Sequence, residues 1–121
     1  QKLGLTDFIH GLPQGYNTML DPLNQGLPRS IIQKILLARA IVIRPKLLFL
    51  EEPLKHIDNE ERNSIINFLL DIENPWTLIA VSSLKHFVEK ADKAIIIEDG
   101  KLQRFEKFKN ANNSLNLMSH A

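Results

Sequence analysis

The sequence contains no cysteine, and that absence excludes several kinds of site at the outset. Without thiols the chain has neither a disulfide framework nor a thiolate metal site, which is compatible with a cytosolic location. No apolar run approaches the roughly 18 residues that a membrane-spanning helix needs. Gln1 to His10 also lacks the charged start and apolar middle of a secretion signal. We therefore expect any contact with a membrane to be made through a partner.

An excess of charge is missing too. The chain carries 15 basic and 14 acidic residues, a formal net charge of +1, and the basic residues are scattered along it. A nucleic-acid partner is not expected, because binding a polyanion needs a concentrated basic surface. What is present is a 44% hydrophobic content over 121 residues, enough for one ordinary globular domain with a core.

The first half of the chain contains one long helical pattern. Before it, a stretch rich in Gly, Pro and Asn predicts a short helix at Leu5 to His10 and a long irregular connection. Apolar residues then recur at helical spacing from Arg29 to Arg44, with Pro28 at the start and a proline closing the segment. Leu47 to Leu50 is apolar throughout, which is typical of a parallel strand covered on both faces.

A second helix begins after this strand. Asp58 is placed to cap it, and Glu61 follows at the spacing of a reciprocal capping box. Apolar residues continue to Ile72, and the Asn-Pro pair at 74 and 75 ends the predicted helix.

The rest of the chain alternates strands with a helix. A strand is predicted at Thr77 to Val81, and Ser82 or Ser83 can cap the helix that follows it. Another strand is predicted at Ala94 to Ile97, and Asp99-Gly100 then predicts a tight hairpin. This order indicates an α/β fold with a mostly parallel sheet, flanking helices and a C-terminal β-hairpin. Residues 108–121 are polar and weakly periodic, and we expect them to form a loose tail.

Two adjacent carboxylates, Glu51 and Glu52, end the apolar run of the first predicted strand. A carboxylate at the end of a buried strand needs either water or a binding partner. On spacing alone, a strand end reaching water explains them. Ligands of open α/β sheets, however, bind at the carboxyl ends of the strands, so the position also suits a functional site.

Several stretches in register indicate which site this is. A hydrophobic strand ending in Glu51-Glu52-Pro follows a helix that contains the sequence LARA at Leu37 to Ala40. GLPQGYNTML precedes that helix, Ile57-Asp58 follows the carboxylates, and ADKAIIIEDGKL comes near the end. In this order they resemble the signature region, Walker B, D-loop and post-switch hairpin of the C-terminal half of an ABC transporter nucleotide-binding domain.

The resemblance implies an incomplete P-loop NTPase-like fold. Residues 1–107 would be the C-terminal part of the domain, with 1–30 the end of the helical subdomain and signature region. Residues 31–107 would hold the Walker B, D-loop and switch-loop region. It further implies ATP and Mg²⁺ as cofactors of a complete domain, a transmembrane transporter domain and a second nucleotide-binding domain as partners, and a place at the cytoplasmic face of a membrane.

Site residues follow from the same resemblance. Glu51 takes the place of the aspartate that orients Mg²⁺, and Glu52 that of the glutamate that polarises the attacking water. Asp58 ends the D-loop. Ser83 stands where the switch-loop histidine contacts the γ-phosphate, with His86 three residues later.

Besides these replacements at positions 51 and 83, the motifs depart from the family pattern in two further respects. No glycine begins the phosphate-binding pattern G-x-x-x-x-G-K-[ST] of Walker A. Where the family signature reads LSGGQ, this chain has Leu27, Pro28, Arg29, Ser30 and Ile31, which compromises close backbone approach to a phosphate.

We therefore expect an ATP-binding part of an ABC transporter that is impaired in hydrolysis and inactive as this chain alone. Two alternatives stay open: a non-catalytic scaffold that retains the ABC fold, and an unrelated parallel α/β domain. Surface positions are expected for His10 and His56 rather than metal ligation, and Lys34 is expected on a solvated or interface face of its helix.

Overall fold

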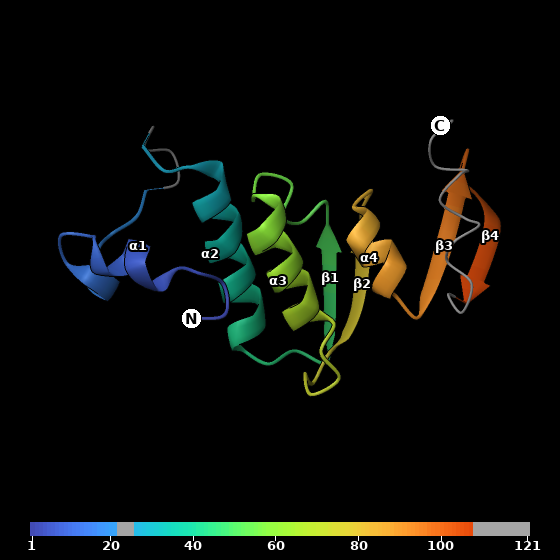
Figure 1. Cartoon of the computed structure of the whole chain (residues 1–121), viewed down its shortest axis with the longest axis horizontal. Helices are drawn as coiled ribbons and strands as arrows, with labels where there is room; N and C mark the ends of the chain where they lie inside the picture. The colour runs from blue at the N-terminus through green and yellow to red at the C-terminus, as the bar shows by residue number, and fades with distance from the viewer. Residues whose placement is uncertain (22–25, 108–121) are drawn as a thin grey trace. The chain divides into compact units, whose positions relative to one another are not determined.

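A computed structural model describes residues 1–21 and 26–107 of the chain (Figure 1). The chain forms two compact units, Gln1–Ser82 and a second that begins at Ser83. The first holds α1 (Thr6–His10), a 3-10 helix η1 (Gly15–Asn17), α2 (Arg29–Val42), β1 (Leu47–Glu51), α3 (Asn59–Leu69) and β2 (Thr77–Val81). The second holds α4 (Lys85–Lys90), β3 (Lys93–Glu98) and β4 (Lys101–Lys107).

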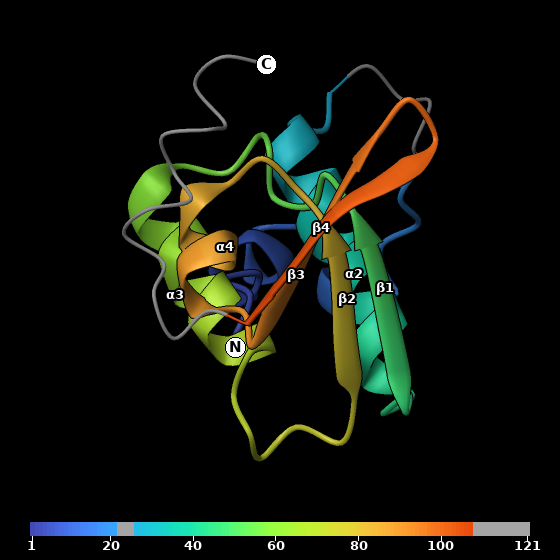
Figure 2. The same cartoon turned by 90° about the vertical axis from the view of Figure 1, so that its right-hand side faces the viewer.

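Parallel pairing of β1 with β2 forms the sheet of the first unit. Leu47 pairs with Thr77 and Glu51 with Val81, so the two strands are in register from end to end. Helix α3 connects them, and α2 and α3 both lie on one side of the strands (Figures 1 and 2). The expected parallel strands and flanking helices are confirmed for this unit.

Only one face of this sheet is covered within the first unit. Leu48 is buried in the core with Leu37 of α2 and Ile65, Ile66 and Leu69 of α3. On the opposite face, Leu47, Phe49, Ile79 and Val81 are between 47% and 60% exposed. The expectation that β1 is covered on both faces is therefore wrong for this unit, since both helices lie on the same side. We call these four side chains the open sheet face.

Helix α3 ends earlier than its apolar pattern suggests. Its last residue is Leu69, and Ile72 lies beyond it in solvent. The Asn74 amide donates to the carbonyl of Phe68 at 2.5 Å, and the Trp76 indole N–H donates to that of Leu69 at 3.0 Å. These side chains satisfy carbonyls that a longer helix would have bonded internally. The predicted extension to Ile72 is wrong for this reason.

The second unit is a short helix followed by a hairpin. β3 and β4 pair antiparallel, and Asp99 and Gly100 between them have φ angles of 50° and 72°, as predicted for a tight turn. Leu84 precedes α4 without a side-chain cap, so the expected serine cap is wrong. The hairpin forms its own two-stranded sheet, separate from β1 and β2, so one continuous sheet is not formed in the described residues.

The expected tail at 108–121 lies outside the described residues. In the part of the chain that the structure describes, no helix has the length and apolarity needed to cross a bilayer.

Two isoleucines near the end of α3 test the observed helix boundary. Ile66 is 0% exposed, whereas Ile72 is 94% exposed. We expect Ile66→Ala to lower the free energy of unfolding by about 2–5 kcal/mol, because it removes buried methyl groups and leaves a cavity. Ile72→Ala is the matched control and should stay within about 0.5 kcal/mol of the parent chain. Urea unfolding followed by circular dichroism measures both, and equal losses would contradict the boundary.

Candidate nucleotide-binding edge

One end of the first unit brings together the segments that the sequence marks as functional. The carboxyl ends of β1 and β2 and the N-terminal ends of α2 and α3 all lie at this end (Figure 1). They converge because each helix runs antiparallel to the strand that it precedes. Ligands of α/β sheets bind at such edges, where helix N-termini favour anionic groups. Arg29, Glu51, Glu52 and Asp58 all belong to these segment ends.

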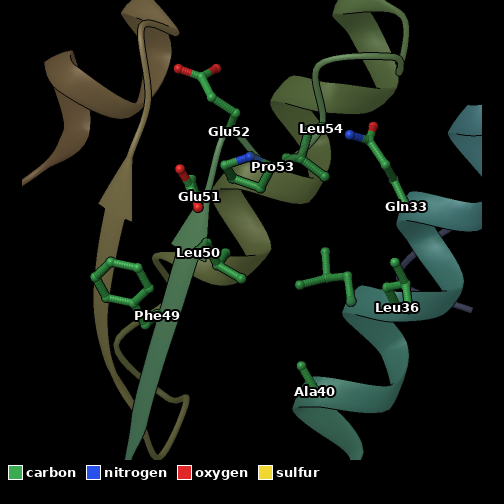
Figure 3. A pocket seen from close by; sticks show the side chains of 10 residues that line it. Gln33, Leu36, Ala40, Phe49, Leu50, Glu51, Glu52, Pro53 and Leu54 are labelled. Atoms are coloured by element: carbon green, nitrogen blue, oxygen red, sulfur yellow. The ribbon is translucent and has the colours of Figure 1, made fainter.

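The two adjacent carboxylates are in different backbone environments. Glu51 is the last residue of β1 and is exposed, on the same strand face as Leu47 and Phe49. Glu52 has left the strand with a φ of 39°, yet its N–H still donates to the carbonyl of Val81 at 2.8 Å. Its carboxylate extends beyond the strand end (Figure 3). Water reaches both side chains, so neither is a buried charge that requires a partner.

The backbone after β1 is held in an unfavourable conformation. Glu52 and Leu54 have φ angles of 39° and 68°, in the left-handed region that costs a residue with a Cβ roughly 1–2 kcal/mol. Leu54 is fully buried, and this packing fixes the turn. Strained backbone that the surrounding packing holds in place is found preferentially at functional sites.

A groove lies between α2 and the end of β1. Gln33, Leu36, Leu37 and Ala40 line one side and residues 49–54 the other, enclosing about 250 Å³ (Figure 3). Its lining is mostly apolar, and Glu51 and Glu52 are among the residues that line it, while their carboxylates point away from α2 (Figure 3). Small-molecule sites usually measure about 300–1,000 Å³, so this groove alone is too small for a nucleotide.

The signature segment leads directly into α2. Pro28 occupies the N-cap position and its carbonyl accepts from Ile31 and Ile32, without a side-chain cap. Arg29 is the exposed first residue of the helix, and Leu27 and Ser30 are partly buried. The structure thus brings the sequence-predicted residues Leu27, Pro28, Arg29 and Ser30 to the same end of the unit as Glu51, Glu52 and Asp58.

Ser83 is the remaining sequence-predicted residue. It is exposed and begins the second unit, while His86 is partly buried within α4. Both belong to the second unit, whereas Glu51 and Glu52 belong to the first, and the role of Ser83 at the edge stays a prediction. In residues 1–21 and 26–107, no three His, Asp or Glu side chains group as a metal site. Mg²⁺ is usually held by one or two carboxylates with water and phosphate oxygens, so Glu51 as its ligand also stays a prediction.

Asp58 caps α3 as predicted. Its Oδ1 accepts from the N–H groups of Glu60 and Glu61, both at 3.1 Å. The reciprocal half of the capping box is wrong, because the carboxylate of Glu61 pairs with Lys34 of α2, with 2.5 Å between Oε1 and Nζ. Of the two expected positions for Lys34, a solvated or an interface face of its helix, the structure shows an interface with α3, since the Lys34 side chain is only 7% exposed.

Sequence reasoning missed the two polar links between α2 and the segment after β1. Besides Lys34 and Glu61, the side-chain carbonyl of Gln33 accepts from the backbone N–H of His56 at 3.1 Å. The partners are 27 and 23 residues apart in sequence. Nothing local to either position signals such pairing. The only hint is that Lys34 falls between the apolar residues Ile31 and Leu37 of the helix pattern.

Comparison with known proteins decides the family. No family model matches the chain. It is 35% identical over 97 residues to the exotoxin translocation ATP-binding protein PaxB of Pasteurella aerogenes, covering 80% of this chain and 14% of PaxB. It is 34% identical over 99 residues to the alpha-hemolysin translocation ATP-binding protein HlyB of Escherichia coli, covering 82% of this chain and 14% of HlyB. A third relative is ABC transporter 1 of Ajellomyces capsulatus, 35% identical over 95 residues, covering 78% of this chain and 7% of that protein.

The chain belongs to the ABC transporter ATP-binding family. This ABC family chain spans only a small part of the curated relatives that it matches, which are much longer proteins.

The cap of α3 in this ABC family chain gives a direct test of the edge geometry. We expect Asp58→Ala to lower the free energy of unfolding by about 1 kcal/mol, because two helix N–H groups lose their acceptor. Asp58→Asn is the control, since an asparagine side chain caps equally well. Thermal or urea unfolding checks both, and an Asp58→Asn chain as unstable as Asp58→Ala would show that the carboxylate acts other than as a cap.

Proposed function

We propose that this chain is the C-terminal part of a nucleotide-binding domain that couples ATP binding to transport by a membrane-spanning partner. The observation that supports this most is the shared edge, where Glu51 ends β1 and Glu52 follows it, at the same end of the unit as the starts of α2 and α3. The order of these segments along the chain is that of the signature, Walker B and D-loop regions.

Each sequence-predicted site residue has a role in the proposal. Glu52 is the base that polarises the attacking water, and Glu51 orients Mg²⁺, with ATP as the nucleotide. Arg29 and Ser30, at the start of α2, approach the phosphates of a nucleotide held by a second nucleotide-binding domain. Leu27 and Pro28 shape the same loop, Asp58 supports it from the D-loop, and Ser83 takes the switch-loop position.

The exposed apolar side chains of the open sheet face indicate that another polypeptide segment covers it. Parallel sheets are almost always covered on both faces, and exposed apolar patches of neighbouring side chains mark interaction sites. Leu47, Phe49, Ile79 and Val81 form such a patch. We propose that the part of the domain that carries the glycine-rich phosphate loop covers it and supplies the volume that the groove lacks.

Hydrolysis is proposed to be weak or absent. Pro28 removes an amide from the signature loop, and Arg29 fills space that a glycine leaves open. The extra methylene of Glu51 relative to aspartate shifts its carboxylate against the strict octahedral geometry of Mg²⁺. Such a domain would act as the impaired member of an asymmetric pair at the cytoplasmic face of the membrane.

A scaffold that retains the ABC fold without binding nucleotide is the second candidate. The observation that favours it is that residues which support the fold are retained, while residues expected to contact the nucleotide are replaced. The Asp58 cap and the buried Leu54 turn are formed, while the signature glycines are replaced.

A chimera tests both candidates. In this chimera, the part of the chain that matches HlyB replaces the 99 matched residues of HlyB. The remainder of HlyB then supplies the phosphate loop. We expect saturable Mg-ATP binding with turnover at least about tenfold below that of parental HlyB, because each misplaced catalytic contact costs on the order of 1.4 kcal/mol or more. Calorimetry measures binding and phosphate release measures turnover.

Two variants of the chimera sharpen this test. Glu51→Asp should raise turnover by restoring the shorter Mg²⁺ ligand, and Glu52→Gln is the matched control that removes the base. Turnover at the parental rate that Glu52→Gln abolishes would refute the impairment. No saturable binding in any chimera that folds would favour the scaffold.

A further inference from the structure

Two consecutive residues of α2 contact two different parts of the segment that follows β1. Gln33 accepts from the backbone N–H of His56 at 3.1 Å, in the loop before α3. Lys34 donates to Glu61 at 2.5 Å, in the first turn of α3. Consecutive helix residues are about 100° apart around the axis, so α2 reaches the loop with one residue and the helix with the next.

The Lys34–Glu61 contact is a fixed one. Because the Lys34 side chain is almost fully buried, losing its partner would leave an uncompensated charge. Gly4 lies directly against the pair with a φ of 61°, and a methyl group there would lie 2.4 Å from Oε1 of Glu61. The missing side chain at Gly4 leaves the space that the carboxylate occupies. This pair therefore joins α2 to α3.

The Gln33–His56 contact is of another kind. It is exposed, it is a single neutral hydrogen bond, and it is made to a loop amide rather than to a helix. The same loop contains the left-handed residues Glu52 and Leu54, and its next link is the bond from the Ile57 N–H to the Leu54 carbonyl at 3.2 Å. A neutral exposed bond can open without unfolding the packed core.

We propose that Gln33 is a positioning residue that ties the loop between Glu52 and Asp58 to helix α2. Gln33 lies one helical turn after Arg29, at the start of the helix that the signature segment opens. When the N-terminal end of α2 moves, the hydrogen bond from His56 to Gln33 moves the loop between Glu52 and Asp58 with it. The Lys34–Glu61 pair keeps the helices together while this bond opens and closes. The importance of this contact for a nucleotide site rests on the proposed function, whereas the hydrogen bond between Gln33 and His56 does not.

Amide hydrogen exchange of the nucleotide-free chain tests the tie. We expect Gln33→Leu to speed exchange at His56 by about tenfold, since the amide loses its acceptor. Exchange at Ile57 should rise with it, because the two amides belong to one loop. The Glu52 amide should not change, because Val81 of β2 holds it. The buried α3 residues Ile65 and Ile66 report global unfolding and should not change either.

Two further variants separate positioning from general damage. Gln33→Glu keeps an oxygen acceptor and should retain slow exchange at His56. Arg39→Leu introduces the same side chain at an exposed position of the same helix and should leave the loop amides unchanged. Unaltered His56 exchange in Gln33→Leu, or equally faster exchange at Glu52, Ile65 and Ile66, would overturn the proposal. Because no nucleotide is present, this outcome is independent of whether the chimera binds Mg-ATP.

Discussion

Parallel pairing of β1 and β2 is the constraint on which the rest of the first unit depends. The in-register ladder continues past the end of β1 through the bond from the Glu52 N–H to Val81, so the turn after the strand starts at a fixed point. With that point fixed, α3 must return along the sheet before β2 can begin. The starts of both helices and the ends of both strands then share one edge. The site is a consequence of this connectivity.

Elements with a strong local signal could be predicted from the sequence. The periodic apolar pattern of α2, the apolar run of β1, the Asp58 cap and the Asp99-Gly100 turn each depend on neighbouring residues, and each is formed. The partner of the Glu61 side chain, which lies far away in the sequence, could not be predicted in this way. The carboxylate of Glu61 has the spacing for a capping box, but a buried lysine on another helix is a stronger partner than a backbone amide.

The sequence names candidate site residues, whose roles stay predictions, but it does not predict the geometry of the segment that carries them. The order of motifs identifies Glu51, Glu52 and the 27–30 segment, and the structure brings them to one edge. The φ angle that turns Glu52 out of the strand and the role of Gln33 have no sequence signature. Burial of β1 on both faces was predicted from apolarity alone. Apolarity shows that a face needs cover, but it does not show that the same unit provides it.

The position of Trp76 has a consequence for spectroscopy. It is the single tryptophan of the chain, its indole is bonded to the end of α3, and its ring meets that of Phe68 edge to face with centroids 6.1 Å apart. Intrinsic fluorescence therefore reports on the docking of α3 in the first unit. Because the second unit contains no tryptophan, a melting curve recorded at this emission follows the surroundings of the Trp76 indole at the end of α3.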